Sequence, residues 1–118
     1  SVRINEAYQR LKDPLKRAAY LCELNGAPIR AEDNTAMPAA FLMQQMAWRE
    51  ALDDAQTADD LENILSEVNA SMKEALQICE RLLDQDHDFI QSAAQVRALM
   101  FIERFAQDVQ TRFEQMGH

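Results

Sequence analysis

Side chains able to carry out chemistry are few in this chain, and they do not converge. The two histidines lie apart, because His87 stands in a polar turn and His118 is the last residue. A di-iron helical bundle needs Glu-x-x-His twice, and that spacing does not occur. The patterns H-E-x-x-H and G-x-S-x-G and a glycine-rich phosphate loop are missing too. The sequence therefore predicts no enzyme, no catalytic or metal-binding residues and no cofactor.

Cys22 and Cys79 are the only cysteines, and no C-x-x-C motif offers a zinc ribbon or a redox pair. Both lie on apolar faces and are expected in the core as small apolar residues. Two unpaired thiols favour a reducing compartment, so we expect a cytoplasmic protein. No apolar run approaches the roughly 20 residues of a membrane span, and no signal-peptide pattern opens the chain.

The charge is acidic and unevenly spread. The 118 residues carry a net charge of −8, which argues against a nucleic-acid partner because phosphates require a basic footprint. Residues 1–30 hold six Lys/Arg against three Asp/Glu, a net of +3. Residues 31–118 hold six against seventeen, a net of −11. This asymmetry indicates two units of different character.

Residues that favour helices dominate the chain, so any functional site must be positioned by helices. Only two Gly and three Pro interrupt them, so an all-α fold is expected. A first helix over residues 2–12 should end at Asp13-Pro14, where a second helix begins and runs to Asn25-Gly26. Residues 26–38 have the composition of a loop. These segments predict a short helical hairpin at the front of the chain.

Three longer helices follow. The third covers about residues 38–55, and Thr57 with Asp60 forms a capping box that starts the fourth. A polar turn over residues 84–88 leads into the fifth, which runs to near Met116. The fourth and fifth helices carry apolar seams of coiled-coil type, and a short turn makes them antiparallel neighbours, so a three-helix bundle is expected. The seam residues are Leu61, Leu65, Val68, Met72, Ala75, Cys79 and Leu82, then Leu99, Ile102, Ala106, Val109, Phe113 and Met116.

The third helix, AAFLMQQMAWREALDDA, has more large apolar residues than one buried face needs. At 100° per residue, Trp48, Leu52 and Ala55 fall within about 40° of Phe41 and form a complete core stripe. Three further apolar residues fall between about 100° and 200° from Phe41, with charged residues among them. This second set comprises Leu42, Met43 and Met46, hereafter the strip, with Arg49, Glu50 and Asp53.

Two interpretations of the strip stay open. The bundle can bury it, for instance beneath the N-terminal hairpin. Alternatively it stays exposed and docks a partner, as contiguous exposed apolar surface usually does, and flexible methionines suit that role. Phe101 and Phe105 on the fifth helix pose the same choice: both pack in the core against the third helix, or Phe101 extends the strip.

Several stretches resemble a known family. INEAYQRLKDPLKRAAYL, residues 4–21, resembles the last third of a J-domain. FLMQQMAWREALDDA, residues 41–55, and VRALMF, residues 96–101, resemble the C-terminal domain of the HscB family, the J-type co-chaperones of iron–sulfur cluster assembly. The likeness runs in order over nearly the whole chain. It implies that residues 1–26 are the C-terminal part of a J-domain, 27–37 a linker, and 38–118 a three-helix scaffold-binding domain.

The resemblance also implies partners. Such a protein delivers the cluster scaffold IscU to the ATP-driven chaperone HscA. Two departures from the family pattern fall on the third helix: Ala47 stands where an acidic residue is expected, and Met46 replaces a usual Leu. One charge contact is therefore in question. Residues matching the family's scaffold-binding positions are Leu42, Met43, Met46, Arg49, Glu50 and Phe101.

J-domains stimulate the chaperone's ATPase through a His-Pro-Asp loop, and His87-Asp88-Phe89 is not that motif. We expect that loop to precede Ser1, so this chain should bind scaffold without stimulating the ATPase. One rival is a homo-oligomerising helical-bundle adaptor that has no role in cluster assembly. Another is a small enzyme or ligand carrier that uses the methionine-rich strip as a pocket wall.

Overall fold

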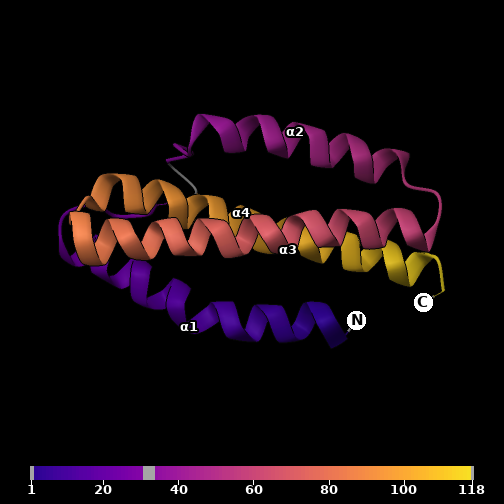
Figure 1. Ribbon diagram of the computed structural model, residues 1–118, viewed down its shortest axis with the longest axis horizontal. Helices are drawn as coiled ribbons and strands as arrows, with labels where there is room; N and C mark the ends of the chain where they lie inside the picture. The colour runs from indigo at the N-terminus through magenta and orange to yellow at the C-terminus, as the bar shows by residue number, and fades with distance from the viewer. Residues whose placement is uncertain (1, 31–33, 118) are drawn as a thin grey trace.

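The computed structural model describes residues 2–30 and 34–117, which are helical apart from the linker and short turns (Figure 1). No strand occurs among them. The predicted all-α fold class is therefore confirmed. In chain order the elements are α1 (Val2–Leu24), α2 (Ala39–Asp54), α3 (Ala58–Arg81), a π-helical turn η1 (Leu82–Asp86) and α4 (Phe89–Gln115).

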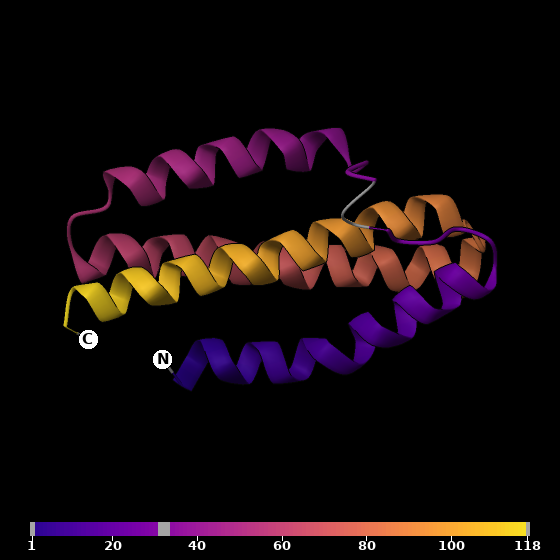
Figure 2. The ribbon, with the colours of Figure 1, turned by 180° about the vertical axis from the view of Figure 1, so that it is seen from behind.

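The two longest helices form the centre of the molecule. α3 and α4 run antiparallel along each other, with α2 on one side of the pair and α1 on the opposite side (Figures 1 and 2). The molecule measures 45 × 26 × 23 Å, and its long dimension follows from helices that rise about 1.5 Å per residue. The three-helix bundle of α2, α3 and α4 agrees with the prediction.

The predicted helix end at Asp13-Pro14 is wrong, because α1 continues through Pro14. Proline removes one N–H donor and crowds the preceding turn, which kinks a helix when packing still holds it. Figure 2 shows the axis of α1 changing direction about midway. Leu15 and Ala18 are buried in the common core and hold the second half in place. The side chains of residues 2–12 lie outside what the structure describes.

The signal at Asn25-Gly26 does end α1. Gly26 has a φ of 81°, which an L-residue adopts only with strain. The Ala27 N–H then donates to the Cys22 carbonyl at 2.8 Å, the six-to-one bond of a Schellman cap. The chain thereby turns back towards α4, and Ala27 and Ile29 enter the core.

The predicted capping box at the start of α3 is present. Thr57 Oγ1 accepts from the Asp60 N–H at 3.1 Å, and Asp60 Oδ2 accepts from the Gln56 and Thr57 N–H groups at 3.0 and 3.2 Å. These backbone hydrogen bonds hold the pKa of the Asp60 carboxyl below its usual value. The boundary between α2 and α3 is thus fixed by local sequence.

The α3 seam departs from prediction only at its end. The wider π-helical turn changes the register, so Leu83 rather than Leu82 is buried there. His87 follows with a φ of 52°, and the Asp88 side chain accepts from the Gln91 N–H at 3.1 Å to cap α4. The polar turn therefore reverses the chain as expected.

One core joins all four α-helices and the linker. Cys22 and Cys79 are buried in it as predicted, and burial raises the pKa of the Cys79 thiol to about 12. Leu15, Ala18 and Ile29 belong to the same cluster as the α3–α4 seam. The division of the chain at residues 26 and 38 stays a prediction.

Candidate docking surface on helix α2

One face of α2 is buried against the bundle. Phe41, Trp48 and Leu52 are 9%, 1% and 7% exposed, which confirms the predicted core stripe. Trp48 stacks on Phe105 of α4 with ring centroids 5.5 Å apart, and Phe41 meets Trp48 edge to face at 6.0 Å. Aromatic pairs in these geometries add to the free energy of area burial, so this stack fixes the rotation of α2.

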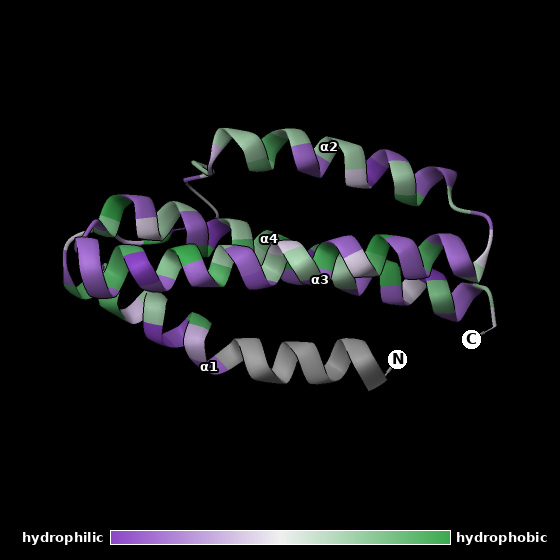
Figure 3. Ribbon diagram, in the orientation of Figure 1, coloured by the Kyte–Doolittle hydropathy of each residue, from purple (hydrophilic) through white to green (hydrophobic). Residues whose placement is uncertain are grey.

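The strip lies on the other side and is exposed. Leu42, Met43 and Met46 are 45%, 72% and 71% exposed. α1 runs along the opposite side of the α3–α4 pair, so the N-terminal segment does not cover the strip (Figure 1). Figure 3 shows apolar residues recurring along α2 although it borders the bundle on one side only. The interpretation that the bundle buries this strip is therefore wrong.

Phe105 and Phe101 have different environments. Phe105 is fully buried, whereas Phe101 is only partly buried at the edge of the core. The Phe101 ring meets Phe41 edge to face at 5.8 Å, and it lines an open groove together with Leu42. Phe105 is thus a core residue, whereas Phe101 lies beside the strip and extends its apolar surface.

Of the two charged candidate residues, Arg49 contacts its own chain. Its Nη1 lies 2.8 Å from Asp108 Oδ2 on α4, and both side chains are nearly half exposed. The guanidinium carbon lies 5.1 Å from the Phe105 ring centroid and 5.8 Å from that of Phe101, within cation–π range. Glu50 is exposed on the outer side of α2. Arg49 therefore both borders the candidate site and holds α2 on α4.

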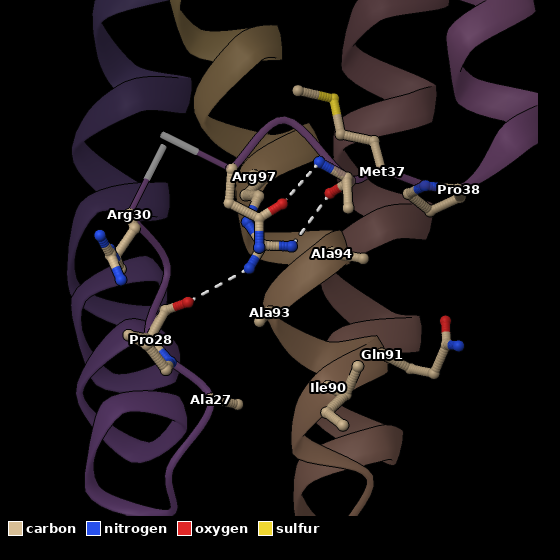
Figure 4. Close-up of a pocket in the computed structure, with 12 residues that line it drawn as sticks. Ala27, Pro28, Arg30, Met37, Pro38, Ile90, Gln91, Ala93, Ala94 and Arg97 are labelled. Atoms are coloured by element: carbon tan, nitrogen blue, oxygen red, sulfur yellow. Dashed lines mark hydrogen bonds between the residues drawn. The ribbon is translucent and has the colours of Figure 1, made fainter. Parts of the chain in front are cut away.

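Sequence reasoning gave no role to Arg97, yet it holds the linker. This side chain is 6% exposed, and it donates to the carbonyls of Ile29 at 2.8 Å, Ala36 at 3.0 Å and Pro28 at 3.2 Å. Figure 4 shows the guanidinium between the linker and α4. The sequence alone gives only a weak signal, an arginine among the apolar residues of α4, and it does not show which carbonyls this arginine binds.

The far end of α2 is held in a similar way. Arg112 Nη2 on α4 donates to the carbonyl of Ala55 at 2.8 Å, directly after the last helical residue, Asp54. Arg97 binds the chain two residues before Pro38, the cap at the start of α2. Two arginines of α4 therefore fasten both ends of α2, and the strip is presented on a helix of fixed position.

The site can bind through apolar contact and charge. Among the described residues no group of three or more His, Cys, Asp or Glu side chains is placed to hold a metal ion. Within the same ranges, every helix is too short or too polar to traverse a lipid bilayer. The exposed side chains of α2 offer thioethers, an aliphatic chain and single charges. This set of groups suits recognition of a protein surface.

Comparisons with known proteins identify the family of the chain. The family described as HSCB C-terminal oligomerisation domain matches residues 37–110. The co-chaperone protein HscB homolog of Bordetella petrii is 48% identical over 92% of this chain and 65% of its own length. The homolog of Burkholderia multivorans is 49% identical over 98% of this chain and 67% of its own.

The chain spans about two thirds of the length of these curated relatives. No solved structure matches it. The family match includes both α2 and the part of α4 that carries Arg97 and Phe101. With a family match over more than half of its residues and relatives nearly half identical, the chain belongs to the HscB family of co-chaperones.

Proposed function

We propose that this chain docks the iron–sulfur cluster scaffold IscU on the strip of α2 and delivers it to the chaperone HscA. One observation carries the proposal: α2 exposes Leu42, Met43 and Met46 while its other face is fully packed. Large apolar side chains with exposures of 45–72% on one helix face usually mark an interaction site. The HscB names of the relatives support a co-chaperone role for the chain.

The strip suits a transient contact. Each Leu or Met side chain buried on binding contributes about 1.5–3 kcal/mol before ordering costs. Three such residues with the edge of Phe101 therefore give modest affinity, as delivery of a cargo requires. Held by arginines at both ends, α2 loses little further freedom on binding, which limits the entropic cost.

Charged residues among the apolar residues of the strip orient the scaffold. Glu50 is exposed and available to a cationic group of the scaffold, and Arg49 keeps nearly half of its side chain in solvent. Ala47 contributes no charge where the family pattern has an acidic residue, so this chain makes one charge contact fewer. In this arrangement the apolar strip supplies most of the affinity and the charges supply specificity.

In the proposed organisation residues 1–26 are the end of a J-domain, 27–37 a linker and 38–118 the scaffold-binding bundle. These 118 residues contain no His-Pro-Asp sequence, so the chain by itself binds scaffold without stimulating the ATPase of HscA. An ATPase assay with HscA, IscU and this chain should show no increase, and clear stimulation would refute this part. Two buried free thiols support a cytoplasmic setting.

The double variant Leu42→Ala with Met43→Ala tests the docking proposal. Both side chains are exposed, so the free energy of unfolding should change little. The dissociation constant for IscU, measured by calorimetry, should rise at least tenfold. The matched control is Tyr20→Ala with Leu24→Ala, which removes two exposed side chains from α1 on the other side of the bundle. Unchanged affinity in the first variant, or equal losses in both, contradicts the proposal.

A second candidate function has one observation in its favour. The matching family is described as an oligomerisation domain, and an exposed strip can pair with its own copy. Sizing of the purified chain separates the two candidates. A monomer that forms a larger complex only when IscU is added supports scaffold docking. A dimer that Leu42→Ala with Met43→Ala dissociates supports self-association instead.

A further inference from the structure

A groove continues from the strip to the linker. It lies between the linker, α2 and α4 and has a volume of about 630 Å³. It is lined by Leu42 of the strip and by Phe101, which lies beside the strip. Met37 from the linker and Met100 from α4 add two thioether side chains to its walls. Sulfur-containing, flexible walls adapt to apolar side chains of varied shape. The apolar surface of the candidate site is therefore larger than α2 alone provides.

The groove is already formed in the free protein. Gln45 Nε2 donates to Met37 Sδ at 3.1 Å and holds that side chain against α2. Arg97 fixes the linker on the other side through its three carbonyl contacts. Phe101 is held by its edge-to-face contact with Phe41. Because the linker, Met37 and Phe101 are already positioned, the groove binds with a smaller ordering cost than a surface that must first assemble, while Met100 can still adapt to its occupant.

The charged side chains that line the groove, among the described residues, are cationic: Arg97 and Arg104. This sign stands out on a chain with a net charge of −8. Arg97 is buried and fully engaged by carbonyls, but Arg104 is exposed and forms no ion pair with a described residue. A carboxylate at the rim would therefore be attracted to Arg104, and none of the described residues that line the groove would oppose it with a negative charge.

From these walls and charges we propose that the groove receives a segment of the scaffold that carries an apolar side chain next to a carboxylate. The apolar side chain packs between Met37, Met100 and Phe101, and the carboxylate pairs with Arg104. This inference rests on the proposed function, because Leu42 of the strip and the adjoining Phe101 both line the groove. It makes Met100 and Arg104 determinants of scaffold recognition beyond the residues of α2.

The test measures IscU binding by the 118-residue chain with Met100→Ala and Arg104→Glu as separate variants. The dissociation constant should rise about fivefold for Met100→Ala. For Arg104→Glu it should rise about tenfold, with a loss that shrinks as salt is added. Leu24→Ala and Arg81→Glu are matched controls, since these exposed residues do not line the groove. Circular dichroism checks that every variant is folded.

The outcomes separate this inference from the docking proposal. If Leu42→Ala with Met43→Ala weakens binding but either Met100→Ala or Arg104→Glu binds as tightly as the wild type, the groove assignment is overturned and docking on the strip stands. If the α2 double variant leaves IscU binding unchanged, the proposal of docking on the strip is refuted, and the groove assignment loses its basis. Losses in both groove variants that exceed those of their controls support the assignment.

Discussion

Arg49 on α2 and Asp108 on α4 form an ion pair, with Nη1 and Oδ2 2.8 Å apart. The same guanidinium lies 5.1 Å from the ring centroid of Phe105. Arg49 thus belongs at once to the candidate docking residues and to the contacts that keep α2 in place. A loss of binding on its removal would be ambiguous unless these two roles are measured separately.

Comparing Arg49→Ala with Asp108→Ala separates them. Both side chains are nearly half exposed, so the pair contributes only about 0.2–1 kcal/mol to stability and both variants should fold. Arg49→Ala should weaken IscU binding, whereas Asp108→Ala leaves the cation free for the scaffold and should not. Titration calorimetry of the two variants checks this. Equal losses of affinity would show that Arg49 acts only through the position of α2.

Trp48 should be essential for stability and irrelevant to direct contact. It is 1% exposed and stacked on Phe105, so Trp48→Ala should cost about 3–5 kcal/mol in urea unfolding. Its indole Nε1 is buried with no hydrogen-bond partner among the described residues. Trp48→Phe removes that unpaired donor and keeps an aromatic ring, so it should lower the free energy of unfolding clearly less than Trp48→Ala does. A Trp48→Phe variant as unstable as Trp48→Ala would contradict this account.

The two-faced character of α2 could be predicted from helical spacing alone, because one turn angle fixes which residues share a side. Phe101 was harder, since an i, i+4 pair of phenylalanines does not say which ring reaches the edge of the core. The continuation of α1 through Pro14 could not be read locally, because burial of Leu15 and Ala18 overrides the proline. The role of Arg97 could not be predicted, because its partners are linker carbonyls at least 61 residues away in sequence.

Arg97 should control the order of the linker and the start of α2. Arg97→Met leaves the carbonyls of Pro28, Ile29 and Ala36 without their donor and should cost about 2–4 kcal/mol. Arg97→Lys keeps the charge but not the planar fork, so it should rescue only part of the loss. Hydrogen exchange should speed up at the first turn of α2 and leave the centre of α3 protected.

Arg104→Met is the control for the same experiment, since Arg104 is exposed and its loss should change stability by less than about 0.5 kcal/mol. Exchange at the start of α2 that is as slow in Arg97→Met as in the wild type would show that the aromatic stack alone holds this helix. Full rescue by Arg97→Lys would show that charge matters and the geometry of the fork does not.

The capping box should make stability depend on pH at the acid end. The pKa of Asp60 is lower in the folded chain than its usual value of 3.8, because its carboxylate accepts the Gln56 and Thr57 N–H groups. Below pH 3.8 the unfolded chain therefore binds more protons than the folded one, and stability falls as the pH drops through the folded pKa. Asp60→Asn should be less stable than the wild type at pH 7, and the difference should vanish over this acid range. Asp59→Asn is the control, because it removes the same charge from the same turn and should keep the acid dependence of the wild type. Equal pH profiles for Asp60→Asn and Asp59→Asn would contradict a role for these two hydrogen bonds.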